Sequence, residues 1–411
     1  MTLSRLPLLL SLALALPASS FAAEFSDAEL AAARALQARI LTLDGHLDTP
    51  ANFERPDFDI RHGHSGNALS QVDLPRMDAG LLDGGFFTIY TGQSDRSPAS
   101  LIADRDAGLS RLLAIHSTVA ANRDTMAIAR TADEAAAIKA AGKRVVYISM
   151  ENASPLEKDH SLLSFYHRAG LTLLSITHTR NNGFGDSGTD QPEWNGLSPA
   201  GRALVEEATR LGIMIDQSHA SDDVFDDLIE MLPVPLVLSH SSAKALYDHP
   251  RNIDDERLRK LVAKGGVIHV NAYGGYLIDT AASAERKAAE SALEDSLGGW
   301  RGMTMASGVE LARGYAELDA KYPVRKATED DFLAHLEHIL DLVGPKHVAI
   351  GMDWDGGGGV EGHDDITTLP RITAWLLRKG YSEQDIADIW GGNVLRVMAQ
   401  VQAHARAQAG K

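Results

Sequence analysis

The sequence predicts an α/β protein, a (β/α)8 barrel of the TIM type with a helical insertion after the seventh strand. Two observations support this prediction. The 411 residues are 44% hydrophobic and 23% charged, which is typical of a globular protein. Eight short apolar runs recur along the chain with helix-like stretches between them. Strand and helix repeated eight times indicate a parallel barrel wrapped by helices, with a doubly wound open sheet as the competing topology.

The expected elements follow in chain order. A first amphipathic helix is expected at about 26–41, with Ser26 as its N-cap. The apolar runs expected as strands are Leu41–Asp48, Gly85–Tyr90, Arg144–Met150, Leu171–His178, Gly212–His219, Pro235–His240, Gly266–Asn271 and His347–Asp353. Short continuous apolar runs of this kind are typical of strands buried on both faces. Helices expected between them include Ser100–Ala121, Ser198–Arg210 and Asp254–Ala263.

Two segments lie outside the strand and helix repeat. Residues 50–75 are rich in His, Asp, Pro and Gly, which indicates a long loop on the active face of the barrel. Residues 279–330 are rich in Ala and Glu, which indicates a helical insertion, and a solvated helical hairpin is favoured over a substrate lid. No low-complexity linker is present, so residues 23–411 are expected to form one domain.

The N-terminus has the features of an export signal. Met1 to Arg5 carries one positive charge, Leu6 to Leu16 is apolar, and small residues lead up to Ala22. We expect cleavage after Ala22, so that residues 1–22 are a signal peptide and the mature protein is periplasmic or secreted. A retained membrane anchor is the alternative, but the apolar run is far shorter than the roughly 20 residues that span a bilayer.

Charge and composition exclude several classes of function. The chain has 39 Lys and Arg against 56 Asp and Glu, a net charge of -17, which argues against nucleic acid as a partner. It has no cysteine, which excludes disulfides, a thiol nucleophile and cysteine-ligated zinc. Any bound metal must therefore be held by histidines and carboxylates.

Ligand-type side chains follow six of the eight expected strands: His46 with Asp48, Glu151, His178, His219, His240 and Asp353. The carboxyl ends of barrel strands form the active face, so these side chains are expected to converge there. His46 and Asp48 are two positions apart in a strand, so both point to the same side and can share one ion. A single histidine at a strand end is usually structural, but this convergence suits a two-zinc site bridged by Glu151.

The remaining histidines do not share this register. His269 lies inside the seventh run, so a role in the core or in support of the site is expected. The others are expected to be surface or packing residues and include His62, His64, His116, His160, His249, His335 and His338.

Over about residues 40–400, a series of motifs resembles the renal-type membrane dipeptidase family of zinc peptidases. The motifs occur in the family's order and are Asp44-Gly-His46-Leu-Asp48-Thr-Pro50, Asp73 to Gly80, Leu171 to His178, Asp216-Gln-Ser-His219, Leu238-Ser-His240-Ser-Ser-Ala243, His249-Pro-Arg251-Asn252, Gly351 to Gly356 and Gly391 to Arg396. The resemblance implies a (β/α)8 barrel with two zinc ions that hydrolyses dipeptides. Some members tolerate a D-residue, a dehydro residue or a β-lactam group on the C-terminal side.

The resemblance also implies roles for individual residues. His46 and Asp48 would bind one Zn²⁺, His219 and His240 the other, and Glu151 would bridge them. His178 would hold the scissile carbonyl or its oxyanion, and Asp353 would carry the proton. Arg251 would bind the substrate carboxylate and Tyr273 would contact the substrate. The sequence departs from the family at Asn152 to Ser154 and at Gln217, which leaves the side-chain preference for substrate open.

The chemistry of these residue types agrees with that assignment. A hydroxide between two zinc ions is a nucleophile available near neutral pH, because bound water has a pKa of ~7. An arginine can bind a carboxylate through two parallel hydrogen bonds, although Arg251 could instead form an ion pair with Asp254 or Asp255.

The predicted function is therefore an exported zinc dipeptidase acting on dipeptides. A two-metal amidohydrolase that acts on a cyclic amide, lactam or lactone is the alternative within enzymes. A non-catalytic periplasmic metal-binding protein is the alternative from another class, and it would need neither His178 nor Asp353. No stable membrane anchor is expected after cleavage, and a homodimer is the assembly considered.

Overall fold

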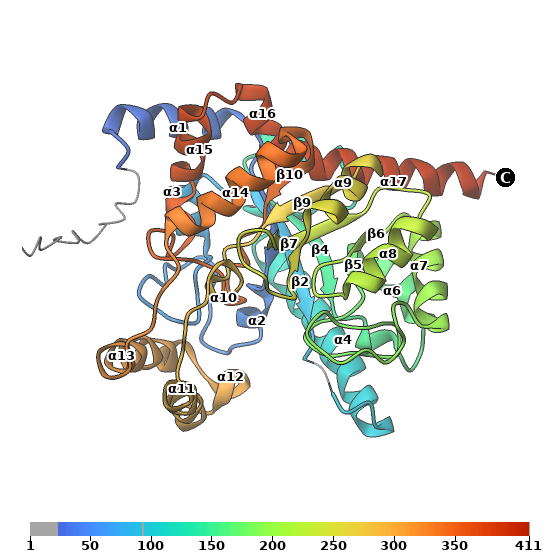
Figure 1. Cartoon of the computed structure of the whole chain (residues 1–411), viewed down its shortest axis with the longest axis horizontal. Helices are drawn as coiled ribbons and strands as arrows, with labels where there is room; N and C mark the ends of the chain where they lie inside the picture. Colours follow the sequence, from blue (N-terminus) through green and yellow to red (C-terminus); the bar gives the residue numbers. More distant parts are fainter. Residues whose placement is uncertain (1–23, 93, 411) are drawn as a thin grey trace, which may run out of the picture.

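The computed structural model describes residues 24–92 and 94–410, in which eight parallel strands form a nearly closed barrel (Figure 1). In the order in which they pair, the strands are β1 (Leu43–Leu47), β2 (Gly84–Tyr90), β4 (Arg144–Glu151), β5 (Leu171–Ser175), β6 (Met214–Asp216), β7 (Val237–Ala243), β9 (Val267–Val270) and β10 (Val348–Ile350). The barrel closes beyond β10, where the Asp48 amide donates to the Trp354 carbonyl at 2.9 Å. The predicted fold class is confirmed.

Each expected apolar run overlaps one barrel strand, and these strands are buried almost throughout. The strands β5, β6 and β10 each end three residues earlier than predicted, so His178, His219 and Asp353 lie in the loops directly after them. Two short strands were not predicted: β3 (Met126–Ile128) pairs with β4, and β8 (Asn252–Ile253) pairs with β7. Both lie outside the barrel order, and each pairs with a strand that also has a barrel neighbour on either side.

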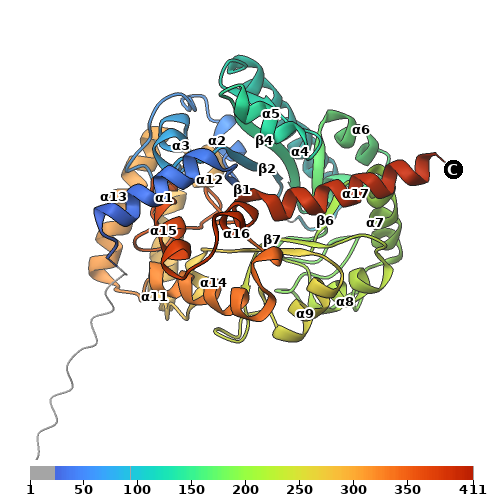
Figure 2. The same ribbon diagram turned by 90° about the horizontal axis from the view of Figure 1, so that it is seen from above.

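Helices surround the strands and close the end of the barrel opposite the active face. The first is α1 (Asp27–Arg39), and its N-cap Ser26 forms the predicted cap, a capping box with Glu29. The others include α2 (Pro50–Phe53), α3 (Leu74–Gly80), α4 (Pro98–Ala121), α5 (Glu134–Ala140), α6 (Leu162–Ala169), α7 (Pro199–Leu211), α8 (Asp222–Met231), α9 (Asp255–Ala263), α10 (Gly274–Leu277), α14 (Glu329–Val343), α15 (Pro370–Arg378), α16 (Glu383–Ala387) and α17 (Asn393–Ala409). Viewed from above, α1, α16 and α17 lie across this end of the barrel (Figure 2).

The segment after β9 contains three helices that stand apart from the barrel wall. They are α11 (Ala284–Ser296), α12 (Gly299–Gly302) and α13 (Met305–Lys321), seen together at the lower left of Figure 1. They have a small apolar core of their own, in which Leu69 from the 50–75 segment packs against Met303 and Leu311. Asn67 also donates to the Met305 carbonyl at 2.6 Å. The insertion is therefore attached to the loop that follows β1.

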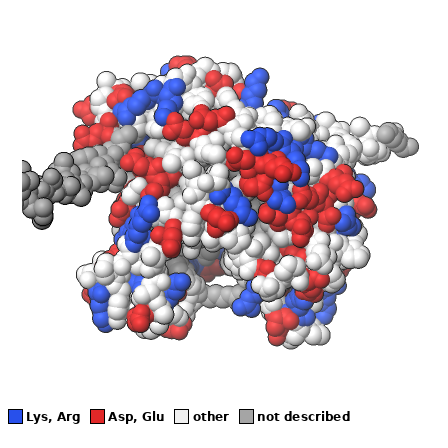
Figure 3. Space-filling view, in the orientation of Figure 1, with Lys and Arg blue, Asp and Glu red and all other residues white. Residues whose placement is uncertain are grey.

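The surface seen in Figure 3 is hollowed at its lower edge, between the α11–α13 helices and the side of the molecule that carries α4. Basic and acidic side chains are interspersed on this face and form no continuous basic surface.

No helix in residues 24–92 and 94–410 has the length and apolar character that a membrane span requires. The predicted signal peptide, residues 1–22, lies outside the described residues.

Candidate metal centre

Five predicted ligand side chains meet at the carboxyl ends of the barrel strands. Glu151, at the end of β4, is central. Its Oε1 atom lies 3.0 Å from Nε2 of His219 and 3.4 Å from Nε2 of His240, and its Oε2 atom lies 3.5 Å from Nε2 of His46. Nε2 of His46 is also 3.2 Å from Oδ2 of Asp48, so the two side chains share a side as predicted. Glu151 therefore has ligand-type side chains beside each of its two oxygens.

The chemistry of these atoms fits a divalent metal. Among the described residues, each of the five ligand side chains has a buried atom without a hydrogen-bond partner: Nε2 of His46, Oδ1 of Asp48, Oε1 of Glu151, Nδ1 of His219 and Nε2 of His240. Buried polar atoms without partners are costly, so such a group indicates a ligand that satisfies them. Imidazole nitrogens and carboxylate oxygens are ligands that Zn²⁺ accepts.

The electrostatics also favour a cation at the cluster. Burial alone would lower the pKa of His46, but the carboxylates of Glu151 and Asp48 raise it well above its usual value. Burial, reinforced by His46, lowers the pKa of His240 to about 3. The carboxylates of Glu151 and Asp48 therefore favour positive charge at this position, which a divalent ion would supply.

Asp353 and His178 flank the cluster on two sides. A carboxylate oxygen of Asp353 lies within 4.8 Å of ligand atoms of His46 and Asp48, and a ring nitrogen of His178 lies within 4.8 Å of those of Glu151 and His219. Burial raises the pKa of Asp353 to about 7; His46 opposes this shift, and the carboxylates of Asp48 and Glu151 add to it. A carboxyl group with this pKa can accept or donate a proton near neutral pH.

The loops that carry these residues turn sharply after their strands. Asn152, His219 and Asp353 have φ values of 68°, 72° and 65°, in the left-handed region that residues with side chains seldom occupy. Such conformations often occur at functional sites, where the surrounding structure holds them in place. Gly356 then brings the backbone against Asp48 and Asp353 so closely that a Cβ atom would overlap both carboxylates.

Arg251 lies beside the cluster, directly before β8. It is only 4% exposed, its Nη2 atom donates to the His240 carbonyl at 3.0 Å, and its guanidinium lies 5.1 Å from the ring centre of Tyr276. The alternative ion pairs are not formed, because Asp254 pairs with Arg257 and Asp255 with His338.

Arg251 is therefore a buried cation with no carboxylate partner among the described residues, and its Nε atom has no hydrogen-bond partner there. Tyr273, the predicted substrate contact, packs against the Tyr276 ring with centroids 4.4 Å apart.

Several supporting residues lay within the quoted motifs but had no predicted role. Asp44 accepts from the His46 amide at 2.9 Å and from the Met352 amide at 3.2 Å, which joins β1 to the segment after β10. Asp216 and Ser239 form a chain of hydrogen bonds to the His240 ring. The sequence did offer one indication of their roles, because Asp216 lies three residues before His219 and Ser239 lies directly before His240. His269 is buried and bonds to the Leu238 carbonyl at 2.9 Å, consistent with its predicted core or supporting role.

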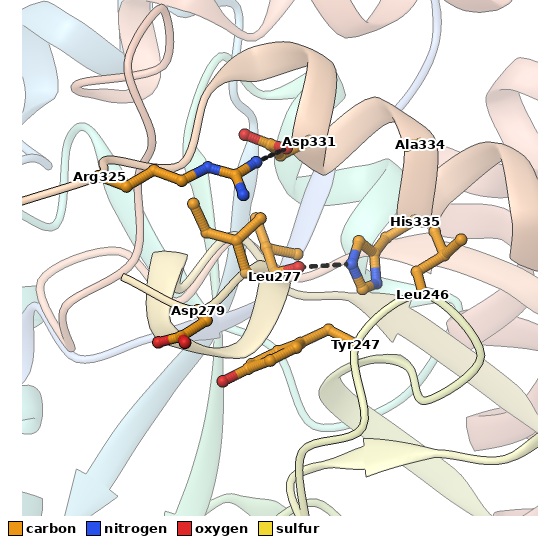
Figure 4. Close-up of a pocket in the computed structure, with 9 residues that line it drawn as sticks. Leu246, Tyr247, Leu277, Asp279, Arg325, Asp331, Ala334 and His335 are labelled. Carbon is orange, nitrogen blue, oxygen red and sulfur yellow. Dashed lines mark hydrogen bonds and ion pairs between the residues drawn. The ribbon is translucent and has the colours of Figure 1, made fainter. Parts of the chain in front are cut away.

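A cavity of about 400 Å³ lies outside the cluster, between Tyr247, the end of α10 and α14 (Figure 4). His335 on its wall accepts from the Ala243 amide at 3.1 Å, and its Nε2 atom lies 3.1 Å from the Leu277 carbonyl. His335 is therefore a packing residue, as predicted, that connects β7 to α10. Because α10 directly follows Tyr273 and includes Tyr276, this packing helps to position the aromatic wall beside Arg251.

Together, the barrel and the cluster of histidines and carboxylates at its carboxyl end define a metal-dependent hydrolase. A sequence model of the membrane dipeptidase family, peptidase family M19, matches residues 30–411. The chain belongs to this family and is a metal-dependent dipeptidase.

Individual relatives agree with this assignment. Dipeptidase tcpJ of Claviceps purpurea is 28% identical over 358 residues, which cover 86% of this chain and 74% of that protein. The crystal structure of the probable dipeptidase PvdM from Pseudomonas aeruginosa superposes with a TM-score of 0.75 at 26% identity, covering 92% of this chain and 100% of that one. A metallopeptidase from Rhodobacter sphaeroides, bound to a phosphinate mimic of the dipeptide L-Ala-D-Ala, gives a TM-score of 0.68 at 25% identity, covering 88% of this chain and 99% of that one.

Proposed function

We propose that the protein is an exported dipeptidase that holds two Zn²⁺ ions and hydrolyses dipeptides with a free C-terminal carboxylate. The observation that carries this proposal is the position of Arg251, a buried guanidinium without a carboxylate partner among the described residues, next to the metal cluster. Export is supported by the sequence of residues 1–22.

In this proposal, each half of the cluster holds one ion. His46 and Asp48 would hold one, His219 and His240 would hold the other, and Glu151 would bind both through its two oxygens. When bound, the ions would supply a nucleophile from water at neutral pH and polarise the scissile carbonyl.

The protein's own residues would perform the remaining work. Arg251 would bind the substrate carboxylate through two parallel hydrogen bonds, with Tyr273 beside it, and so set the distance from the carboxylate to the scissile bond. His178 would hold the carbonyl oxygen as negative charge develops on it. Asp353 would take a proton from the attacking water and deliver it to the leaving amine, for which its pKa of about 7 is suited.

The position of Arg251 also limits substrate length. A third residue would move the terminal carboxylate out of its reach, so dipeptides are the expected class. The L-Ala-D-Ala mimic in the Rhodobacter sphaeroides relative supports the proposal that a D-residue is accepted on the C-terminal side.

The test is an assay of the zinc-loaded protein on L-L and L-D dipeptides, with tripeptides, amidated dipeptides and lactams measured in parallel. We expect hydrolysis of dipeptides and little of the longer or amidated peptides. Rapid hydrolysis of lactams or lactones with none of dipeptides would instead identify a two-metal amidohydrolase.

A further inference from the structure

Asp216, at the end of β6, receives four hydrogen bonds in the interior of the barrel. Its Oδ1 atom accepts from the backbone amides of Ser218 at 3.0 Å and Ser239 at 2.9 Å. Its Oδ2 atom accepts from the hydroxyls of Ser175 at 2.6 Å and Ser239 at 2.5 Å. The carboxylate is 1% exposed. Four donors to two oxygens satisfy an ionised carboxylate, which can only accept.

The hydrogen count fixes the direction of the next bond. Ser239 has one hydroxyl hydrogen, and it is used in the short bond to Asp216. The Ser239 oxygen also lies 2.8 Å from Nδ1 of His240. Because this oxygen can only accept there, the hydrogen of the second bond must be on Nδ1. The Nε2 atom of His240 then carries a lone pair.

That lone pair belongs to the atom that faces the cluster. Nε2 of His240 lies 3.4 Å from Oε1 of Glu151 and has no hydrogen-bond partner within the described residues. A histidine binds a metal through a nitrogen without hydrogen, and the group that bonds to its other nitrogen decides which one that is.

We propose that Asp216 and Ser239 are positioning residues that fix the Nδ1–H tautomer of His240, so that its Nε2 lone pair faces the metal site at all times. This inference rests on the proposed two-metal function of that site. His219 lacks such a support, since its Nδ1 atom has no hydrogen-bond partner within the described residues.

The substitution Asp216→Asn tests the direction of the relay. An asparagine amide in the Oδ2 position would donate to the Ser239 oxygen, and the Ser239 hydroxyl would then donate to Nδ1 of His240. The ring would be forced into the tautomer with hydrogen on Nε2, which cannot bind a metal. Ser239→Ala only removes the constraint, so its effect should be smaller, and Ser239→Thr should restore the bond.

The matched control is Ser175→Ala. It removes a hydrogen bond from the same Oδ2 atom of Asp216 but does not touch Ser239 or His240. Zinc affinity of each of the two ions is measured by competition with a chelator on the purified protein. We expect Asp216→Asn to weaken the binding of one Zn²⁺ ion about 10- to 100-fold, the usual effect of losing a group that supports a metal ligand. Ser239→Ala should weaken the binding of that ion less, and Ser175→Ala should leave the affinity of both ions unchanged.

Nitrogen NMR of the histidine rings gives a readout that is independent of activity and of any variant. In the wild-type protein, Nδ1 of His240 should show a bonded hydrogen and Nε2 should not. A hydrogen on Nε2 in the metal-free protein, or equal affinities in Ser239→Ala and Ser175→Ala, would overturn the inference. Failure of the wild type to bind two ions would instead overturn the proposed function, while the NMR result would still decide the tautomer.

Discussion

Gly356 lies directly against the carboxylate of Asp48, and a Cβ atom at position 356 would overlap Oδ2 of Asp48 and Oδ1 of Asp353. This contact places the loop after β10 against the cluster of predicted metal ligands. The backbone at Gly356 therefore lies against both the proposed ligand Asp48 and the proposed proton carrier Asp353. Only a residue without a side chain fits there.

The first prediction follows from this contact. Gly356→Ala should lower kcat/KM at least about 100-fold, because misplacing reacting groups by about 1 Å can cost that much. The variant should also lose roughly 1–3 kcal/mol of stability, because the added Cβ atom overlaps two buried carboxylates, but it should remain folded. Gly63→Ala is the control, because a Cβ there would meet nothing within 4 Å. Peptidase kinetics and thermal unfolding are compared, and normal kinetics for Gly356→Ala would show that the loop moves freely.

A second prediction concerns the metal count. Glu151→Gln should reduce binding of both ions, because Glu151 contacts the ligands of both halves, whereas His46→Ala should weaken mainly one. Chelation should abolish activity and added zinc should restore it. Elemental analysis gives the stoichiometry, with His62→Ala as a control at a histidine that is 75% exposed. Full activity with a single ion at saturating zinc would exclude the bridged site.

Asp353 should be needed for turnover and not for metal binding. Asp353→Asn should retain both ions and lose about 10²- to 10⁴-fold in kcat, because asparagine cannot carry a proton. Metal content and kcat are measured on the same sample. Loss of one ion in this variant would show that Asp353 is a metal ligand.

Arg251 should bind the negatively charged C-terminal carboxylate of the substrate. Replacing the carboxylate of a dipeptide by an amide should reduce kcat/KM about 10- to 100-fold in the wild type, the value of a charge-assisted hydrogen bond of about 1.5–3 kcal/mol. Arg251→Ala should shrink that difference. Arg257→Ala is the control, since Arg257 pairs with three aspartates away from the site. Equal wild-type rates on both substrates would remove Arg251 from substrate binding.

The last prediction concerns acid stability. Glu329, fully buried at the start of α14, accepts from Arg371 at 2.8 Å and lies 3.2 Å from His363. Burial alone would raise the pKa of Glu329, but the hydrogen bonds from His363 and Arg371 lower it below its usual 4.5. A lowered pKa stabilises the fold above pH 4.5, and this stability is lost as the pH falls through the folded-state value.

Glu329→Gln should therefore cost about 3 kcal/mol of unfolding free energy at pH 7, because it breaks a buried ion pair. The difference from wild type should shrink as the pH falls below 4.5. Chemical unfolding at pH 7, 5 and 3.5 measures it. Glu383→Gln, in a pair that is 57% and 66% exposed, should change stability by less than about 1 kcal/mol. If the difference in unfolding free energy between Glu329→Gln and wild type stayed constant with pH, the lowered pKa of Glu329 would be contradicted.

The barrel could be predicted from sequence because its strands are buried on both faces and therefore read as continuous apolar runs. β3 and β8 could not, since each has only two or three residues and exists because a neighbouring strand lies beside it. Arg251 lies directly before β8 and Asp254 directly after it, so the position of Arg251 relative to Asp254 and Asp255 depends on β8. The absence of an ion pair between Arg251 and either aspartate could therefore be learned only from the structure.

The positions of the cluster residues were predictable because they follow strands whose carboxyl ends must meet. The relay through Asp216 was not, because it needs the register of β6 against β7, in which Asp216 pairs with Val237 and comes within reach of the Ser239 hydroxyl. Strand register is set by packing across the whole barrel, and a short stretch of sequence does not contain it.

The seam between β1 and the segment after β10 has a consequence for the order of synthesis. Asp48 and Trp354 are joined there by a hydrogen bond between residues about 300 positions apart, so the barrel closes only once nearly the whole chain has left the ribosome. Until then, a growing chain can contain all five cluster residues, the last of which is His240, while Asp353 and the loop against Asp48 do not yet exist. Hydrolytic competence should therefore appear in a single late step of folding, and truncated chains should lack it.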